Sequence, residues 1–368
     1  QAKVMARKYD VVVTNPPYLG ARNMNATIKD HLQEHYADAK GDLFSAMMTR
    51  CFNLCHAKRF VATVTMQSWM FLSSYQAFRK RLLTENHIIT LLHMGNNVMR
   101  IAFGTAAVVW RVGSIPRYRG TYFYVEQEDL VNGCPTQFPV VHRRFAQRPD
   151  EDFARIPGSP IAYWASEAVM DAFDRGCPLG DIAPPRQGMA TSDNSRFLRL
   201  WHEVELPRIG FDMTSREEAE ESGRKWFPYN KGGEYRKWYG NKDYVVDWEN
   251  DGRRIRSFDR AVTRNMAYYF LPGITWTDVS SSYLGVRYSP GGFLFDVKGS
   301  CLFPVLGEIP YTLAFLCSKL ASHFAFMLNP TMSFQVGNMA SLPLLLPRDP
   351  TVRSRIEALA QECIDMAR

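Results

Sequence analysis

The chain has 368 residues, 46% of them apolar, so it is long enough for two domains with packed cores. No stretch approaches about 18 uninterrupted apolar residues, which argues against a membrane protein. The net charge of +7, from 44 basic and 37 acidic residues, suits a surface that binds polyanions, although many basic proteins bind no nucleic acid. Seven cysteines, an odd number without a C-x-x-C pair, argue against a disulfide framework or a zinc knuckle and fit the reducing cytoplasm.

A β-branched run near the start of the chain ends abruptly in Asn15-Pro16-Pro17-Tyr18. Residues 11–13 are all valine, which predicts a strand buried on both faces of a parallel sheet. Ligands of open α/β sheets bind at the carboxyl ends of such strands, and adjacent prolines keep the carbonyls of Asn15 and Pro16 away from a strand partner.

These groups suit an exocyclic amine such as N6 of adenine. The Asn15 side chain and the Pro16 carbonyl can each accept one N6 hydrogen while Tyr18 stacks on the extruded base. The alternative is an ordinary strand-to-loop turn, because Asn-Pro is a common turn dipeptide.

Residues 11–18 resemble the N-P-P-Y motif of amino-group DNA methyltransferases, which use S-adenosylmethionine to modify N6 of adenine. The chain as a whole resembles the BREX phage-defence adenine methyltransferases of the PglX or BrxX type and, more loosely, the fused methyltransferase-specificity enzymes. The resemblance implies that Asn15, Pro16 and Pro17 form the catalytic motif with Tyr18, that Tyr18 stacks on the base, and that Asn15 also borders the cofactor.

His31-Leu32-Gln33-Glu34-His35 fits H-x-x-E-H, which can place two histidines one helical turn apart with a glutamate as the base of a zinc peptidase. No distant glutamate in an obvious helical frame offers a third ligand. We favour a solvated helix face here and keep the peptidase as a rival.

Asp42 is the expected N-cap of a helix whose apolar residues follow at i, i+3 and i+4, which makes Cys51 and Cys55 core thiols. Further elements are expected as strands at 59–66, 88–93 and 106–112, with a helix at 75–84. The alternation of strands and helices predicts a parallel α/β sheet, here its second half.

Phe103 lies in the turn before the last of these strands. In amino-methyltransferases the equivalent segment often carries an aromatic residue that packs against the flipped base, so the resemblance makes Phe103 a second base-stacking residue. A phenylalanine before a strand is also common in an ordinary core.

Residues 142–155 are charged, include Arg143, Arg144 and Arg148, and are interrupted or followed by prolines, which predicts a linker. We therefore expect three parts: the C-terminal half of a catalytic domain at 1–145, a DNA target-recognition domain at 146–347 and a C-terminal helix at 348–368. Within the second part we expect helices at 165–175 and 311–328.

Aromatic and basic residues alternate between Lys225 and Arg264. Basic groups contact phosphates and aromatic rings stack or line grooves, which suits DNA, although tryptophans are often core and an arginine run is often a solvated helix face. Residues 228–233 and 236–241 resemble signatures of the family's recognition domain. The expected DNA-binding residues are Lys231, Arg236, Lys237, Trp238, Tyr239, Asn241, Arg253, Arg254, Arg256 and Arg260.

The chain lacks the glycine-rich loop and following acidic residue that hold adenosylmethionine in this class. We expect the main cofactor pocket upstream of residue 1, no metal site, and a C-terminal part that is inactive alone. The expected fold is α/β, a partial class I (Rossmann-like) methyltransferase sheet followed by an α+β target-recognition domain and a C-terminal helix.

The expected function of the whole enzyme is adenine-N6 methylation of double-stranded DNA in phage defence. The expected partners are double-stranded DNA, the remaining N-terminal region of the same enzyme, other defence subunits and acidic DNA-mimic inhibitors, with no membrane. The main rival is a DNA-recognition module whose N-P-P-Y is vestigial.

Overall fold

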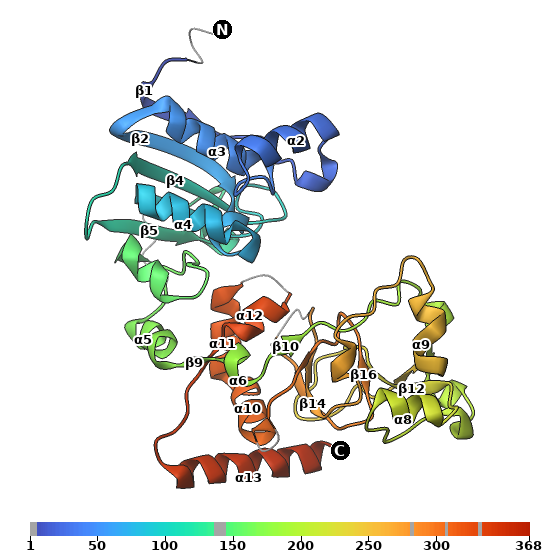
Figure 1. Cartoon of the computed structure of the whole chain (residues 1–368). Coiled ribbons are helices and arrows are strands. Elements are labelled where there is room, and N and C mark those ends of the chain that lie inside the picture. The colour runs from blue at the N-terminus through green and yellow to red at the C-terminus, as the bar shows by residue number, and fades with distance from the viewer. Residues whose placement is uncertain (1–5, 136–144, 280–282, 306–307, 330–332) are drawn as a thin grey trace. The chain divides into compact units, whose positions relative to one another are not determined.

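The computed structural model describes residues 6–135, 145–279, 283–305, 308–329 and 333–368. Its contacts divide the chain into two compact units, Gln1–Asp174 and Arg175–Arg368. Figure 1 shows a helix-covered sheet in the first unit, and shorter strands with more scattered helices in the second.

The first unit is built on a six-stranded sheet in the order β1-β2-β4-β3-β5-β8. Its strands are β1 (Tyr9–Thr14), β2 (Cys55–Met66), β3 (Asn86–Met94), β4 (Thr105–Val112), β5 (Arg119–Val125) and β8 (Ala146–Pro149). Pairs β1/β2 and β3/β5 are parallel, whereas β2/β4, β3/β4 and β5/β8 are antiparallel. The predicted parallel sheet is therefore wrong in part, because only a loop joins β3 to β4 and a parallel pair needs a longer crossover.

Helices cover one face of this sheet (Figure 1). They are α3 (Leu43–Leu54) and α4 (Gln76–Glu85), and α2 (Ala26–His35) packs beside α3 through Leu32 and Ala46. Large buried side chains such as Phe44, Trp69 and Trp110 fill the core between helices and sheet, and Val12 packs against them. Cys51 and Cys55 are buried free thiols, as predicted.

The other face of the sheet is open in the described part of the chain. Val11 and Val13 are 57% and 72% exposed, because alternate residues of a strand point to opposite faces. Apolar side chains, including Val13, Leu92 and Phe123, line a hollow of about 430 Å³. The prediction that this strand is buried on both faces is therefore wrong for this chain.

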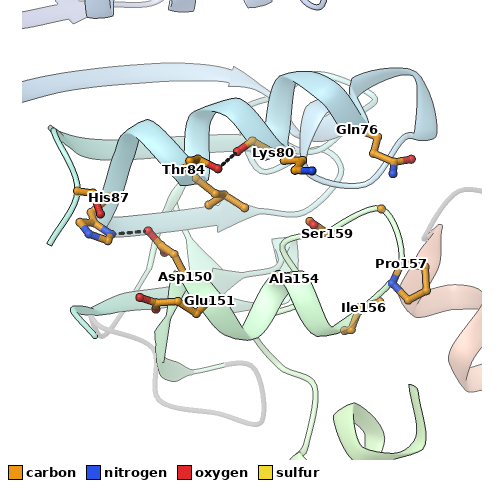
Figure 2. A pocket seen from close by; sticks show the side chains of 13 residues that line it. Gln76, Lys80, Thr84, His87, Asp150, Glu151, Ala154, Ile156, Pro157 and Ser159 are labelled. Atoms are coloured by element: carbon orange, nitrogen blue, oxygen red, sulfur yellow. Dashed lines mark hydrogen bonds and ion pairs between the residues drawn. The ribbon is translucent and has the colours of Figure 1, made fainter. Parts of the chain in front are cut away.

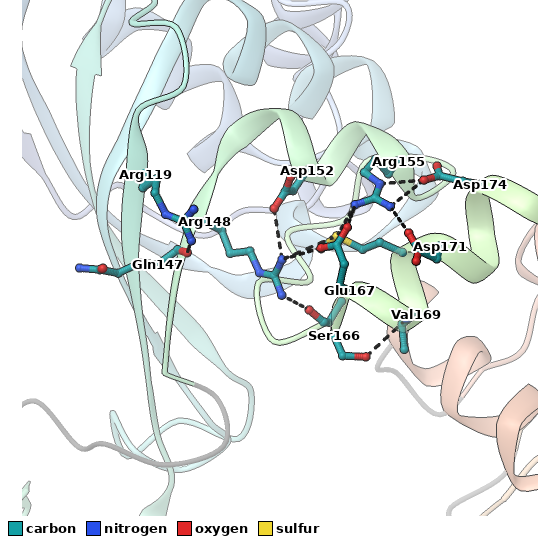
Figure 3. Close-up of polar contacts among 12 residues, drawn as sticks. Arg119, Gln147, Arg148, Asp152, Arg155, Ser166, Glu167, Val169, Asp171 and Asp174 are labelled. Atoms are coloured by element: carbon teal, nitrogen blue, oxygen red, sulfur yellow. Dashed lines mark hydrogen bonds and ion pairs between the residues drawn. The ribbon is translucent and has the colours of Figure 1, made fainter.

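The predicted linker after residue 145 is part of the first unit. Strand β8 pairs with β5, and η5 (Asp150–Arg155) leads to α5 (Glu167–Arg175), at whose start the Ser166 hydroxyl accepts from the Val169 amide. Arg155 forms ion pairs with Glu167, Asp171 and Asp174, all on α5 (Figure 3).

Arg148 also joins this segment to the residues before α5. It pairs with Asp152 at 3.2 Å and donates to the Ala165 carbonyl (Figure 3). The division between units at Asp174 thus falls later than the predicted one at 145. Arg143 and Arg144 lie outside the described residues.

The second unit contains two four-stranded sheets, β10-β17-β14-β15 and β11-β13-β12-β16. The first comprises β10 (Pro185–Arg186), β17 (Cys301–Leu302), β14 (Gly273–Trp276) and β15 (Val286–Ser289). The second comprises β11 (Leu198–Leu200), β13 (Tyr244–Asp247), β12 (Trp226–Asn230) and β16 (Leu294–Phe295). Around them lie α6 (Leu179–Ile182), α7 (Asn194–Phe197), α8 (Arg216–Glu221) and α9 (Glu249–Arg256).

Four of the nine aromatic residues between 225 and 264 are core residues. Trp226, Phe227, Tyr229 and Trp248 are all buried. β12 is buried along its whole length because it lies between β13 and β16. These four rings therefore cannot stack on a base.

The helix predicted at 311–328 is two helices, α10 (Ile309–Leu316) and α11 (Lys319–Leu328), bent by 68°. Ser318 breaks the run because its side chain accepts from the Ala321 amide and caps α11. Among the described residues no single helix could span a membrane, although this bent pair passes the test of length and composition.

The chain ends in α12 (Val336–Ala340), β18 (Pro343–Leu344), which pairs with β9 (Cys177–Pro178), and the predicted α13 (Pro350–Ala367). α13 packs on α10 through the buried Ala360 and Ile364. The ion pair between Arg353 and Glu308, at 2.7 Å, adds to this contact. The tail helix is therefore part of the second unit.

Candidate functional site

The N-P-P-Y segment begins where β1 ends. Thr14 is the last residue of β1 that pairs with β2, and the four following residues leave the sheet. Asn15 and Pro17 are exposed, Pro16 is buried and Tyr18 is half-buried. The Tyr18 hydroxyl lies 3.4 Å from Asn15 Oδ1 and 3.4 Å from the Val64 carbonyl. The tyrosine is thus held over the carboxyl ends of β1 and β2, with the asparagine amide beside it.

Asp42 fixes this segment to helix α3. Its carboxylate accepts from the Leu19 amide at 2.9 Å and from the Phe44 amide at 3.2 Å. Asp42 is thus the predicted N-cap of α3, and it also binds the backbone directly after the motif. Burial of Tyr18 raises the pKa of its phenol, and the charge of Asp42 raises it further, so the hydroxyl remains a donor at neutral pH.

Two aromatic rings pack against Tyr18. The Phe103 centroid lies 5.9 Å from that of Tyr18 with the planes at 64°, and the Phe44 centroid lies 6.1 Å away, edge-on. The expected proximity of Phe103 to Tyr18 is therefore present, and Phe103 is 36% exposed beside it. Whether Phe103 stacks on a base stays a prediction.

Three residues that sequence reasoning missed support the loop that carries Phe103. The backbone N–H of Gln67 donates to the Gly104 carbonyl at 3.0 Å. The side-chain Oε1 of Gln67 lies 2.6 Å from His93 Nε2. His93 Nδ1 in turn lies 3.2 Å from the Tyr163 hydroxyl. A Cβ at Gly104 would approach the Gln67 side chain to 2.5 Å, so only glycine fits there without a shift. No periodicity or motif in the sequence marks these residues.

A second polar cluster lies at the amino end of β3, the opposite end of the sheet. His87 Nδ1 lies 2.9 Å from Asp150 Oδ2, and the Tyr122 hydroxyl donates to Asp150 Oδ1 at 3.0 Å. All three are buried, and burial raises the pKa of Asp150 against the lowering effect of its hydrogen bonds. His87 and Asp150 line a pocket of about 580 Å³ between α4 and the 150–159 segment (Figure 2). The cluster ties β3, β5 and η5 together and lies away from N-P-P-Y.

The H-x-x-E-H segment is on α2. The His31 and His35 rings are 4.6 Å apart, and Glu34 is largely exposed. Within the described ranges no group of three or more histidine, cysteine, aspartate or glutamate side chains is placed to hold a metal ion. The described part of the chain therefore offers this pair no third protein ligand.

Five of the predicted DNA-binding side chains bind other groups of the second unit. One of them is Asn241, whose Nδ2 donates to the Glu234 carbonyl at 2.9 Å. Lys231 Nζ lies 2.6 Å from Asp296 Oδ2, and Lys237 Nζ donates to the Cys317 carbonyl at 2.6 Å. Arg254 and Arg256 form ion pairs with Asp247 and Asp251. Each would have to share or give up that partner to reach a phosphate.

The remaining predicted DNA-binding residues are exposed or half-buried. Arg236, Arg253 and Arg260 are exposed. Trp238, Tyr239 and Asn241 are half-buried in a loop joined to β15, because the Trp238 amide donates to the Val286 carbonyl and the Tyr288 amide to the Trp238 carbonyl. Trp238 and Asn241 adopt left-handed backbone angles, with φ of 69° and 56°. This loop is a fixed turn with partly accessible side chains.

Comparison with known proteins agrees with these features. Residues 2–99 match the model of the Eco57I restriction-modification methylase family. The chain is 36% identical to the adenine-specific methyltransferase PglX of Lacticaseibacillus casei (strain Zhang), over 97% of this chain and 31% of PglX. It is also 36% identical to the adenine-specific methyltransferase BrxX of Escherichia coli O9:H4 (strain HS), over 100% of this chain and 30% of BrxX.

A solved structure shares the fold. The Type IIL restriction-modification enzyme MmeI in complex with DNA superposes with a TM-score of 0.62 at 12% identity, over 95% of this chain and 48% of MmeI. The chain spans about three-tenths of the length of the two curated relatives. The chain is thus homologous, over nearly its whole length, to part of the PglX and BrxX adenine-specific methyltransferases.

Proposed function

We propose that this chain presents the target adenine in an S-adenosylmethionine-dependent DNA methyltransferase of the BREX type. The observation that carries the proposal is the grouping of Asn15, Tyr18 and Phe103 at the carboxyl end of β1, with one exposed amide beside two packed rings. Asn15 Oδ1 and the Pro16 carbonyl accept the two N6 hydrogens of an extruded adenine, and Tyr18 stacks on its ring.

The chemistry follows from these contacts. Two accepted hydrogen bonds keep the N6 lone pair on nitrogen, where it can attack a sulfonium methyl carbon in line. The N–C bond would form as the S–CH3 bond breaks, the neutral thioether would leave, and the methylated nitrogen would lose one proton to solvent. Tyr18 and Phe103 replace the stacking that the base loses when it leaves the duplex. S-adenosylmethionine supplies the methyl group when bound, and Asn15 borders it.

The rest of the cofactor pocket belongs to a further part of the enzyme. Two features of the first unit support this: β1 is an edge strand with β2 as its neighbour, and Val11 and Val13 lie exposed on the open apolar face. Soluble proteins seldom leave such a surface uncovered. We propose that the first unit is the C-terminal half of a class I methyltransferase domain whose N-terminal half covers this face.

We propose that the second unit is the target-recognition domain and that it binds double-stranded DNA. Exposed Arg236, Arg253 and Arg260 would contact phosphates and set an affinity that depends on salt, whereas base-edge contacts each contribute roughly 1 to 3 kcal/mol of sequence discrimination. Acidic DNA-mimic proteins and other phage-defence subunits are further proposed partners of this basic surface.

The rival is a DNA-recognition module with a vestigial N-P-P-Y segment. Long-read sequencing of DNA from cells that carry the complete gene separates the two. If the protein is an enzyme, we expect N6-methyladenine at one asymmetric site. This modification should disappear in cells that carry the Asn15→Ala variant. An unmodified genome in the presence of the intact, expressed protein would support the rival.

A further inference from the structure

The second unit contains a pocket that the proposed methyl transfer does not use. Its volume is about 320 Å³, and it lies against β12 and β13. The side chains that matter for the argument are five aromatic rings and one lysine: Trp201, Phe211, Tyr239, Tyr244, Phe293 and Lys242. Trp201 and Phe211 are 44% and 46% exposed, so these two rings are open to a ligand. Pockets of at least about 300 Å³ are large enough for small organic ligands.

Lys242 is the basic group in this pocket. Its Nζ lies 4.2 Å from the Phe293 centroid, 5.5 Å from the Tyr239 centroid and 3.3 Å from Asn230 Oδ1. An amino group protonated to ammonium has three hydrogens, and Asn230 takes one. Burial lowers the pKa of Lys242 to about 7, so near neutral pH a large fraction of the amine is uncharged and does not require an anion as its partner. It can donate to a neutral acceptor.

The backbone around the pocket is held in place. Gly292 has a φ of +89°, and a Cβ there would lie 3.1 Å from the Asp212 backbone, so this close approach favours glycine. The Trp201 amide donates to the Asp243 carbonyl at 2.9 Å, which fixes Trp201 beside the start of β13. A pocket with a fixed backbone loses less entropy when a ligand binds.

We propose that this pocket binds an unstacked nucleobase of DNA. The aromatic rings offer stacking surfaces, and Lys242 can donate to a base carbonyl or ring nitrogen. The acidic Asp212 on the wall disfavours a phosphate inside but can accept from an exocyclic amine. An apolar protein side chain would give the remaining hydrogens of the half-buried Lys242 no acceptor, which costs free energy.

This would be a second base site, in a different unit from Asn15 and Tyr18. The proposal rests on DNA binding by the second unit, but it goes beyond adenine presentation. The matched probes are two duplexes of equal charge, each with a one-nucleotide bulge that holds either 2-aminopurine or an abasic spacer, together with the same duplex without a bulge.

The test measures the affinity of the 368-residue chain for each duplex and the fluorescence of 2-aminopurine. We expect about tenfold tighter binding of the 2-aminopurine bulge than of the abasic bulge, with quenching of its fluorescence. Trp201→Ala and Lys242→Met should each abolish the preference and leave affinity for the unbulged duplex unchanged. Tyr235→Ala, which removes an exposed ring that does not line the pocket, should retain the preference.

The outcomes separate this proposal from DNA binding itself. Equal affinity for the two bulged duplexes overturns the base pocket and leaves DNA binding intact. If no duplex binds, the test uses 2-aminopurine deoxyriboside and the total tryptophan fluorescence of the chain. Quenching in wild type but not in Trp201→Ala or Lys242→Met would support the base pocket and contradict DNA binding. If the nucleoside gives no quenching either, or N-acetylphenylalaninamide quenches at lower concentration, the base pocket is wrong. Circular dichroism and thermal melting check the fold of each variant.

Discussion

The Phe103 ring lies 5.9 Å from the Tyr18 ring, centroid to centroid, although the two residues belong to different loops of the first unit. If Phe103 completes the surface on which the base packs, Phe103→Ala removes part of that surface and lowers kcat/KM for methylation by the complete enzyme roughly tenfold. Initial rates on duplex DNA measure this. Phe145→Ala is the control, because Phe145 is equally exposed in the same unit and packs on Phe123. If kcat/KM falls equally in both variants, Phe103 has no specific role in packing against the base.

Asp42 should matter to both stability and activity, because it binds the amides of Leu19 and Phe44. Asp42→Ala loses the helix cap and should lower the free energy of unfolding by about 1 to 2 kcal/mol. Asp42→Asn keeps an acceptor oxygen and should therefore retain most of the stability that Asp42→Ala loses. Chemical denaturation measures the change. Asp349→Ala, which removes the exposed cap of α13, should lower stability without changing the methylation rate.

Arg155 holds α5 to the rest of the first unit through three carboxylates. The pairs are partly exposed, so we expect Arg155→Ala to destabilise the fold by only about 1 kcal/mol and the effect to shrink at high salt. Hydrogen exchange of the α5 amides should rise locally. Arg119→Ala, on the adjoining sheet, is the control and should leave α5 exchange unchanged. Unaltered α5 exchange in Arg155→Ala would show that packing alone holds the helix.

Lys242 gives a pH test of its environment. Its pKa falls from 10.5 to about 7 on folding, so between these values the unfolded chain binds more protons than the folded one. The unfavourable contribution of Lys242 is therefore largest below about pH 7 and fades as the pH rises towards 10.5. The stability of wild type relative to Lys242→Met should rise from pH 7.5 to 9.5, as measured by urea denaturation. Lys242→Gln should give the same trend, and a flat difference in both would contradict the shift.

Arg253 and Arg254 are neighbours with different surroundings. Both are exposed, and Arg254 also pairs with Asp247. We expect Arg253→Ala to weaken DNA binding and lower the slope of log affinity against log salt by about one. Arg254→Ala should mainly lower stability, because the buried Asp247 loses its ion pair with Arg254 and keeps only the longer one with Lys225, at 3.7 Å, among the described residues. Fluorescence anisotropy at several salt concentrations distinguishes the two, and a larger salt effect from Arg254 would contradict this assignment.

Local patterns predicted much of the first unit. The valine run, the Asp42 cap and the apolar periodicity gave helices and strands close to those observed, because these signals arise within one element. The mixed sheet was not predicted, since pairing of β3 with β4 depends on contacts across the chain. The break at Ser318 was missed because the apolar pattern continues across it. The Ser318 hydroxyl nevertheless caps α11 and so starts a new helix there.

The candidate site was predictable where a contiguous motif carries it, at residues 15–18. Its supports were not. Gln67, His93 and Tyr163 meet through a hydrogen-bonded chain that has no sequence period. In the second unit, composition alone could not separate the buried Trp248 from the half-buried Tyr239, or show that Arg254 pairs with Asp247. Partners distant in sequence decide these cases.

The central claim is that an extruded adenine donates its amino hydrogens to Asn15 and Pro16. The direct measurement is transfer of labelled methyl from S-adenosylmethionine to duplex DNA by the complete enzyme, with DNA affinity measured in parallel. Asn15→Ala should lower transfer by at least about a thousandfold while affinity changes less than about threefold. Transfer within about tenfold of wild type by Asn15→Ala would contradict the account.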